Sequence, residues 1–182
     1  MSSAQKILII GFPGSGKTSL ARVLEKSLGH PLVSADDVLA EVGTIELATD
    51  EISQRLKKNP SWIYEGRLKN FGNLVWPSAD IAILIQDSFW ICWSRYMRRE
   101  LRNSSKTWAQ RWQDCIFVIK NRRKIKSAQR EVLRSLEDRQ KKDSTPRLRM
   151  VTIPSAEVSA ILAQESGHRR EFLSIFQKAS LP

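Results

Sequence analysis

Residues 11–18, with the sequence GFPGSGKT, constrain the fold of this chain more than any other segment. They match the pattern of a phosphate-binding P-loop and directly follow the apolar run Ile7–Ile10. Glycines let the backbone curl until successive N–H groups face inward, and the positive end of the next helix adds to this anion site. The helical pattern that follows ends at Gly29, so the motif has the strand, loop and helix context that it requires. The sequence therefore predicts a nucleoside triphosphate site.

The side chains of the loop have separate predicted roles. We expect the Lys17 ammonium to contact the β- and γ-phosphates of ATP. The hydroxyl of Thr18 is expected to ligate the Mg²⁺ ion that bridges these phosphates. The predicted nucleotide-binding residues of this segment are Gly11, Gly14, Ser15, Gly16, Lys17, Thr18 and Ser19.

The composition, with 41% hydrophobic residues over 182 positions, fits a single domain with its own core. The apolar run before the loop is too short for a signal-peptide core, and no segment approaches the roughly 18 apolar residues of a membrane span. We therefore expect a cytoplasmic protein without a membrane partner. Cys92 and Cys115 have no nearby His or Cys, which favours buried thiols over a zinc site or a disulfide.

The net charge of +11 comes mainly from the segment between Arg95 and Arg149. Such a basic run indicates either a solvated helical face or a surface where an anion docks. A phosphate-handling protein has a use for arginines, and a strongly basic chain also suits nucleic acid. Two classes of function therefore stay open at this point. The first is an enzyme that uses the arginines to handle phosphate groups. The second is a nucleic-acid-associated protein, either a polynucleotide 5′-kinase or a non-catalytic ATP-dependent binder.

Strand-like runs alternate with helical patterns, which predicts an α/β fold with a parallel sheet. The run Ile81–Ile85 is apolar at every position, as expected for a central strand that is covered on both faces. The other predicted strands are residues 7–10, 31–33, 62–64 and 148–153. Further helical patterns cover residues 45–56, 88–101, 108–119 and 125–136, with a short amphipathic helix in the tail at about 168–182.

The predicted helix at residues 88–101 carries two stripes of side chains. The apolar stripe is expected to lie in the core and consists of Phe89, Trp93, Tyr96 and Met97. The basic stripe consists of Arg95, Arg98, Arg99 and Arg102. The next helical pattern begins with Trp108 and Trp112, whose rings are also expected to pack rather than bind a ligand.

Acidic residues follow two of the predicted strands. Asp36 follows the second strand, where a carboxylate can orient an acceptor hydroxyl or hold a Mg²⁺-bound water, or can instead belong to a helix start. Glu65 follows the third strand, and Arg67 either binds an acceptor phosphate or carboxylate or lies on a plain turn. The chain has no Asn-Lys-x-Asp motif, which argues against a switch GTPase.

Together, GFPGSGKTSLA, the strand ending at Asp36, WIYEGRL and ADIAILIQDSFWICWSRYMRRELR resemble the P-loop kinases of the adenylate kinase superfamily. The chain is most similar to the adenylate kinase-related group labelled DNA topology modulation proteins, over Lys6 to about Gln164. It departs from that group at Glu65, where Asp is usual, and at Arg67, where Asn is usual. The resemblance implies a three-layer fold with strand order 2-3-1-4-5 and an arginine-rich helical lid at about residues 95–123.

The resemblance also implies an ATP- and Mg²⁺-dependent phosphotransferase that acts on a nucleotide or another small hydroxylated or phosphorylated acceptor. The lid arginines implied by the resemblance, Arg95 and Arg99, stabilise the charge of the transferring phosphoryl group. Arg98 is expected to lie off the helix face that these two share and to matter less. The implied catalytic residues are Lys17, Asp36, Arg95 and Arg99. The implied acceptor-binding residues are Asp36, Glu65, Arg67 and Arg122. Arg122 or Arg123 would also provide a second pair of lid arginines. Thr18 and Glu65 would hold Mg²⁺, and Pro154 and Ser155 would border the adenine.

Overall fold

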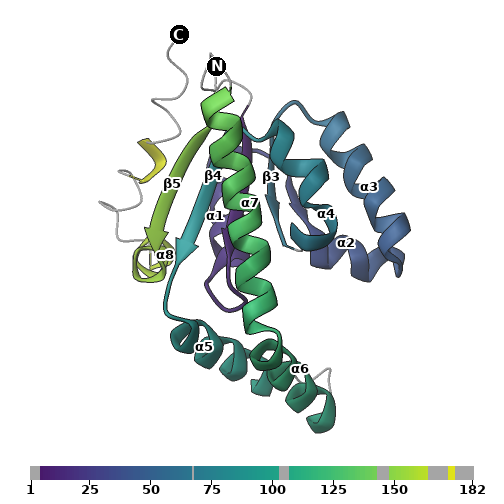
Figure 1. Ribbon diagram of the computed structural model, residues 1–182, viewed down its shortest axis with the longest axis vertical. Helices are drawn as coiled ribbons and strands as arrows, with labels where there is room; N and C mark the ends of the chain where they lie inside the picture. Colours follow the sequence, from purple (N-terminus) through teal and green to yellow (C-terminus); the bar gives the residue numbers. More distant parts are fainter. Residues whose placement is uncertain (1–4, 67, 103–106, 143–147, 164–171, 175–182) are drawn as a thin grey trace.

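The computed structural model describes residues 5–66, 68–102, 107–142, 148–163 and 172–174 (Figure 1). The predicted sheet is confirmed, because five parallel strands lie in the order β2-β3-β1-β4-β5. Leu8 of the central strand lies opposite Tyr64 on one side and Ala82 on the other. The strands are β1 (Lys6–Gly11), β2 (Leu32–Ser34), β3 (Trp62–Glu65), β4 (Ile81–Gln86) and β5 (Arg149–Pro154).

Helices cover both faces of this sheet and form three layers with it (Figure 1). Successive side chains of a strand point to opposite faces. Leu8 and Ile10 therefore pack toward α2, α3, α4 and α7, whereas Ile7 and Ile9 pack toward α1 and α8. These helices are α1 (Lys17–Leu28), α2 (Ala35–Val42), α3 (Ile45–Lys58), α4 (Leu68–Val75), α7 (Arg122–Lys142) and α8 (Ser155–Leu162), with a 3₁₀ turn η1 (Trp76–Ser78).

Three of these helices, α2, α4 and α8, were not among the helices expected from the sequence, although a helix start at Asp36 was an open alternative. Each spans only eight residues, which is too short for a clear apolar period. The start of α2 is fixed by Ser34, whose Oγ accepts a hydrogen bond from the Asp37 amide at 3.4 Å. Of the predicted tail helix, only residues 172–174 are described, and Phe172 is buried among the side chains that α1 and β5 contribute.

Below the carboxyl ends of the strands lie α5 (Phe89–Arg102) and α6 (Trp108–Lys120) (Figure 1). The expectation of a buried apolar stripe on α5 is wrong, since its four members are only half-buried. The rings of Trp108 and Trp112 are also more exposed than expected, at 61% and 41%. The physical reason is position: α5 packs on the P-loop and α6 packs on α5 and α7, and no other described element covers their outer side.

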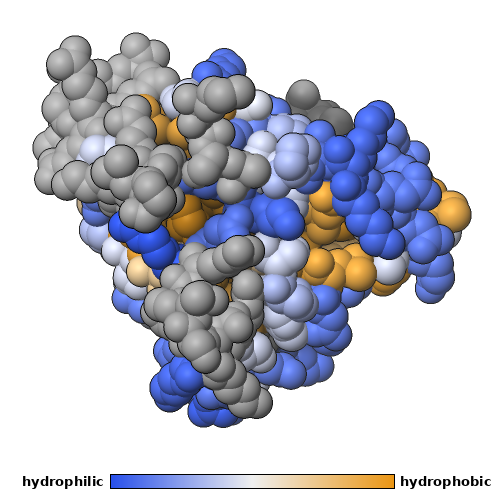
Figure 2. All heavy atoms as spheres, turned by 90° about the horizontal axis from the view of Figure 1, so that it is seen from above, coloured by the Kyte–Doolittle hydropathy of each residue, from blue (hydrophilic) through white to orange (hydrophobic). Residues whose placement is uncertain are grey.

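The predicted state of the cysteines is confirmed, because Cys92 on α5 and Cys115 on α6 are both buried free thiols. Burial raises the pKa of the Cys92 thiol. Figure 2 shows the molecule from above, a face on which hydrophilic side chains predominate and hydrophobic ones show only in limited areas. Within the described ranges, no helix is both long enough and apolar enough to cross a bilayer.

The P-loop lies directly against the backbone of α5. Gly14 has a φ of +83°, and a Cβ at this position would overlap the carbonyl oxygen of Cys92 and lie 3.0 Å from the amide nitrogen of Tyr96. Beside this contact, the rings of Phe12 and Phe89 meet edge to face with centroids 5.6 Å apart. A glycine is therefore needed at position 14 both for the turn and for the close approach of the helix.

We expect Gly14→Ala to lower the free energy of unfolding by more than about 2 kcal/mol. The positive φ alone costs an L residue about 1–2 kcal/mol, and the added methyl group would also push against α5. Gly29→Ala is the matched control, since Gly29 has a φ of +70° but nothing within 4 Å of its added Cβ. Urea unfolding of both variants measures the difference. Equal losses would mean that α5 does not lie against the loop in solution.

Candidate functional site

The P-loop joins the end of β1 to the start of α1. Gly14 and Gly16 have φ values of +83° and +95°, and the Ser15 amide donates to the Phe12 carbonyl at 3.1 Å. The hydroxyl of Ser15 is buried and has no hydrogen-bond partner among the residues described. Buried polar groups normally have a hydrogen-bond partner. A phosphate oxygen bound in this loop would supply that partner to the Ser15 hydroxyl.

Lys17, the first residue of α1, lies across this loop. Its Nζ donates to the Phe12 carbonyl at 3.0 Å. Burial lowers the pKa of Lys17, the carboxylates of Glu65 and Asp36 act in the opposite direction, and the Arg99 guanidinium adds to the lowering. The ammonium therefore shares its surroundings with acids from the ends of β2 and β3 and with an arginine of α5.

Glu65 at the end of β3 is the most buried acid of the site, with 3% exposure. Its Oε1 accepts hydrogen bonds from Thr18 Oγ1 at 3.2 Å and from Ser34 Oγ at 3.0 Å. Mg²⁺ is usually bound through one or two carboxylates with phosphate and water oxygens. Thr18 and Glu65 fit such an ion, and no cluster of three or more His, Cys, Asp or Glu in the described chain offers a metal site of another kind.

Asp36 lies in the first turn of α2, with its side chain exposed to solvent. Burial raises the pKa of the Tyr64 phenol, and the nearby Glu65 and Asp36 carboxylates raise it further. The structure thus brings Asp36, Glu65 and Lys17 together at the carboxyl ends of β1, β2 and β3. Arg67, which was expected to contact the acceptor, lies outside the described residues.

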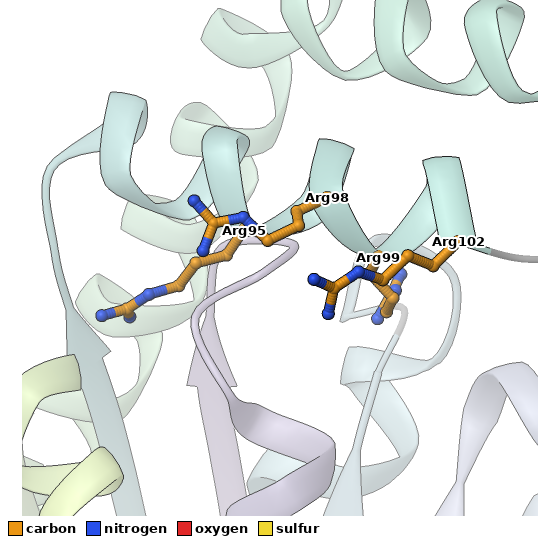
Figure 3. Close-up of a pocket in the computed structure, with 4 residues that line it drawn as sticks. All are labelled: Arg95, Arg98, Arg99 and Arg102. Carbon is orange, nitrogen blue, oxygen red and sulfur yellow. The ribbon is translucent and has the colours of Figure 1, made fainter.

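The four arginines of α5 line one pocket of about 550 Å³ (Figure 3). They are Arg95, Arg98, Arg99 and Arg102, which follow one another at helical spacing. The expectation that Arg98 lies off the shared face is wrong, because it lines the same pocket. Arg99 lies 5.0 Å above the Tyr96 ring centroid and 3.2 Å from Oε1 of the buried Glu100.

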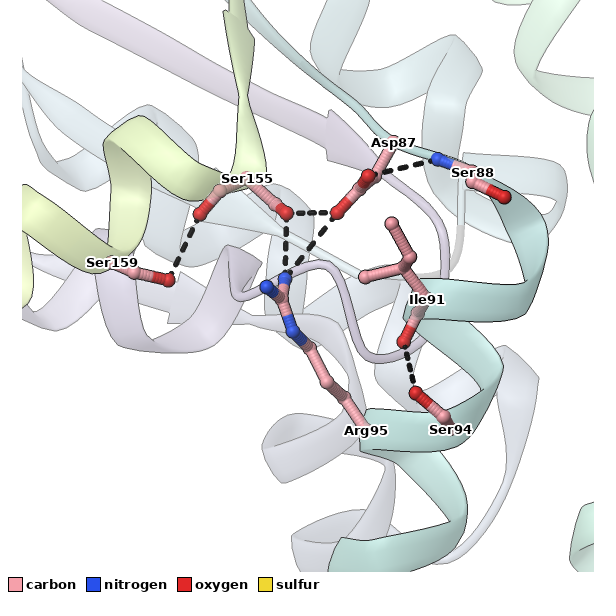
Figure 4. Close-up of polar contacts among 7 residues, drawn as sticks. All are labelled: Asp87, Ser88, Ile91, Ser94, Arg95, Ser155 and Ser159. Carbon is pink, nitrogen blue, oxygen red and sulfur yellow. Dashed lines mark hydrogen bonds and ion pairs between the residues drawn. The ribbon is translucent and has the colours of Figure 1, made fainter.

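Arg95 differs from the other three because it is tied to the ends of β4 and β5 (Figure 4). Its Nη1 donates to Ser155 Oγ at 2.6 Å and lies 3.4 Å from Asp87 Oδ2. The Ser155 hydroxyl in turn donates a short hydrogen bond to Asp87. Asp87 was not predicted as a site residue, although an acid two positions after the apolar run Ile81–Ile85 was the available signal.

A second pocket, of about 880 Å³, lies at the ends of β4 and β5 between α5 and α7. The Arg122 guanidinium, which was expected to bind the acceptor, lies here, 5.9 Å from the Phe89 ring centroid. Since Asp36 follows β2 at the other side of the sheet, Arg122 is not grouped with the acidic residues. Pro154 lines this pocket, whereas Ser155 pairs with Arg95. Other lining residues are Phe12, Trp90, Arg123, Lys126 and Arg130.

No family model matches the chain. Over 56 residues it is 39% identical to a cytidylate kinase of Archaeoglobus fulgidus, a match that covers 30% of this chain and 31% of that protein. The chain therefore spans about a third of the length of this curated relative.

Similar solved structures include a shikimate kinase from Acinetobacter baumannii in complex with shikimate. It has a TM-score of 0.50 and 14% identity, and the match covers 90% of this chain and 96% of that one. A gluconokinase from Sinorhizobium meliloti 1021 has a TM-score of 0.48 and 15% identity, with 98% and 99% covered. None of these three proteins is a DNA topology modulation protein, so that narrower resemblance stays a prediction. The shikimate kinase match, together with the strand order, shows that this chain has the fold of a P-loop kinase.

We expect Lys17→Met to keep the fold and to raise the urea midpoint of unfolding slightly at neutral pH. In the unfolded chain the ammonium has its ordinary pKa of 10.5, whereas burial lowers the pKa in the folded chain. The unfolded state therefore binds more protons between the two pKa values, and wild-type stability rises with pH through that window. The variant should lack this part of the pH slope. A variant that unfolds well below the wild-type midpoint would show that favourable contacts of the ammonium outweigh its burial.

Proposed function

We propose that this chain is an ATP-dependent phosphotransferase that moves the γ-phosphoryl group to a nucleotide or another small hydroxylated or phosphorylated acceptor. The observation that carries the proposal is the grouping of Lys17, Thr18, Glu65 and Asp36 next to a pocket lined by arginines. Ligands of open parallel sheets bind at the carboxyl ends of the strands, where this grouping lies. A carboxylate beside the Thr18 hydroxyl favours catalysis over a non-catalytic ATP-dependent binder.

The proposed roles follow from the chemistry of the side chains. The P-loop amides and the Lys17 ammonium hold the β- and γ-phosphates. Mg²⁺, bound by Thr18, Glu65 and phosphate oxygens, would neutralise charge on the transferring group. The Asp36 carboxylate accepts the proton of the acceptor hydroxyl. The hydroxyl oxygen of the acceptor forms the new bond to the γ-phosphorus, and ADP leaves.

The arginines of α5 supply fixed positive charge near the loop. Guanidinium groups held in place stabilise the negative charge that spreads over the transferring phosphoryl oxygens. Their closeness to Lys17 supports this role, because Arg99 contributes to the lowered pKa of that ammonium. We assign the base of ATP to the pocket between α5 and α7, because its aromatic rings and the guanidinium of Arg122 suit a planar base.

A transfer screen tests the activity. With Mg²⁺ and radiolabelled ATP, we expect label to move to at least one of a panel of nucleoside monophosphates, nucleosides and hydroxylated metabolites above the rate of ATP hydrolysis. Lys17→Ala should abolish transfer. Transfer only to 5′-hydroxyl oligonucleotides, or no transfer at all, would contradict the proposal.

A pair of neighbouring acids provides a sharper comparison. Asp36→Asn should lower the turnover number about a hundredfold or more, because an amide cannot accept the acceptor proton. Asp37→Asn is the matched control, since Asp37 is also exposed in the first turn of α2, and it should stay near wild type. Initial rates at saturating ATP measure both. Equal losses of turnover in both variants would mean that the substitutions disturb α2, and not that Asp36 is the proton acceptor.

The arginine pocket gives a separate prediction. Arg95→Ala, Arg98→Ala and Arg99→Ala should each lower the turnover number more than they weaken ATP binding, because guanidinium contacts strengthen toward the transition state. Arg55→Ala is the control, since Arg55 lies on α3 and pairs with Glu41 and Glu51. Parallel measurement of turnover and ATP affinity separates the two effects. Losses in affinity alone would mean that α5 only holds the nucleotide.

A further inference from the structure

The net charge of the chain comes entirely from residues 89–142, which lie between β4 and β5. Residues 89–142 contain sixteen of the thirty Lys and Arg but only five of the nineteen Asp and Glu. Their excess equals the +11 of the whole chain, so the charges of all other residues balance. These residues include α5, α6 and α7. Of their arginines, the proposed phosphate site uses only those of α5.

The same helices carry most of the exposed large hydrophobic side chains of the described chain. Six of nine lie on α5 and α6, and four of these six are aromatic. Trp90, Trp108 and Phe117 are 58%, 61% and 62% exposed, and the Trp108 and Trp112 rings meet edge to face at 5.9 Å. We call the six exposed residues the aromatic patch: Trp90 and Ile91 on α5, and Trp108, Trp112, Ile116 and Phe117 on α6. Trp108, Trp112 and Ile116 follow one another at helical spacing, whereas Phe117 lies on another side of α6.

A row of cations runs along α7 from the end of α6. Arg122, Lys126, Arg130 and Arg134 recur every fourth residue and are all exposed, whereas Val132 and Leu136 on the other side of the helix are buried. At 1.5 Å per residue the row is about 18 Å long. Ring contacts connect the patch with the P-loop, since Phe12 meets Phe89, which meets Trp90.

We propose that α5, α6 and α7 bind a single strand of nucleic acid, with bases stacked on the aromatic patch and phosphates along the α7 row. Aromatic side chains beside a track of cations are what single strands require, because every base offers a ring face and every nucleotide a negative charge. This binding does not require the phosphotransferase activity, although Arg122, Lys126 and Arg130 of the row also line the pocket assigned to the base of ATP. A second copy of the chain does not suit this surface, because the +11 charge of one copy would face that of the other.

Duplexes and lipid surfaces fit less well. Paired bases are stacked on one another, so exposed rings on a helix have no base face to contact in a duplex. An anionic membrane would attract the cations, but the patch is mainly aromatic, with only Ile91 and Ile116 as aliphatic members. A row of cations along one helix also suits a linear polyanion.

Fluorescence anisotropy with a labelled oligo-dT of about fifteen nucleotides, without ATP, tests the proposal. We expect binding whose affinity falls with salt, with a log–log slope of about −0.7 for each phosphate contacted. The double variant Trp108→Ala/Trp112→Ala should weaken binding about tenfold or more with little change in slope, because it removes stacking and no charge. Leu47→Ala on α3 removes an exposed apolar side chain elsewhere and should have no effect.

A charge variant tests the second half of the surface. Arg130→Gln/Arg134→Gln should make the salt slope shallower by about 1.4, whereas Lys57→Gln/Lys58→Gln on α3 should not. Trp112→Phe keeps a ring and should retain most of the affinity, and unfolding midpoints check that each variant folds.

Four outcomes would overturn the proposal. They are no binding to the oligonucleotide, equal binding to a duplex of the same length, unchanged affinity in the tryptophan double variant, and binding only to vesicles that contain phosphatidylserine.

Discussion

The contact between the P-loop and the backbone of α5 is the constraint on which the site depends. Because residue 14 has no side chain, the helix approaches the loop until the Cys92 carbonyl lies where a Cβ would be. The position of α5 then fixes where its arginines lie relative to the phosphate site. No other described element covers the outer side of α5 and α6, which leaves Trp108 exposed.

Glu65 illustrates how a buried charge can be kept at a functional site. Its carboxylate is almost fully removed from water, yet it accepts hydrogen bonds from Thr18 and Ser34 and lies near the Lys17 ammonium. Such partners offset part of the cost of desolvating a charge. Glu65 and Lys17, which suit phosphoryl transfer, are therefore also residues whose burial costs folding stability, which is a common property of active sites.

The sheet and the P-loop were predictable because their signals are local. An apolar run such as Ile81–Ile85 and a fixed motif at residues 11–18 determine structure without knowledge of distant contacts. The short helices α2, α4 and α8 were not among the expected helices, since eight residues hold too few turns to show a period. The place of Arg122 could not be predicted either, because it depends on where α7 begins after α6.

The contacts of Arg95 with Asp87 and Ser155 could not be predicted from the sequence either. Asp87 and Ser155 are 68 residues apart and meet only because β4 and β5 are neighbours in the sheet. The helical spacing of the α5 arginines predicted one basic stripe, although Arg98 was expected to lie off the face that Arg95 and Arg99 share. The spacing held no information on which of them is tied to the strand ends. Spacing along one helix therefore could not reveal contacts between separate elements, and the order of the strands was expected only from the resemblance to P-loop kinases.

The uneven distribution of charge gives the molecule a large electric dipole. The segment that carries α5, α6 and α7 is strongly positive, while the charges of all other residues balance. A dipole turns in the field of an approaching anion, so the molecule would meet ATP or any other polyanion with the side that carries these helices first. Collisions that begin in the correct orientation raise the association rate, and dissolved salt confines this advantage to separations of about one Debye length or less.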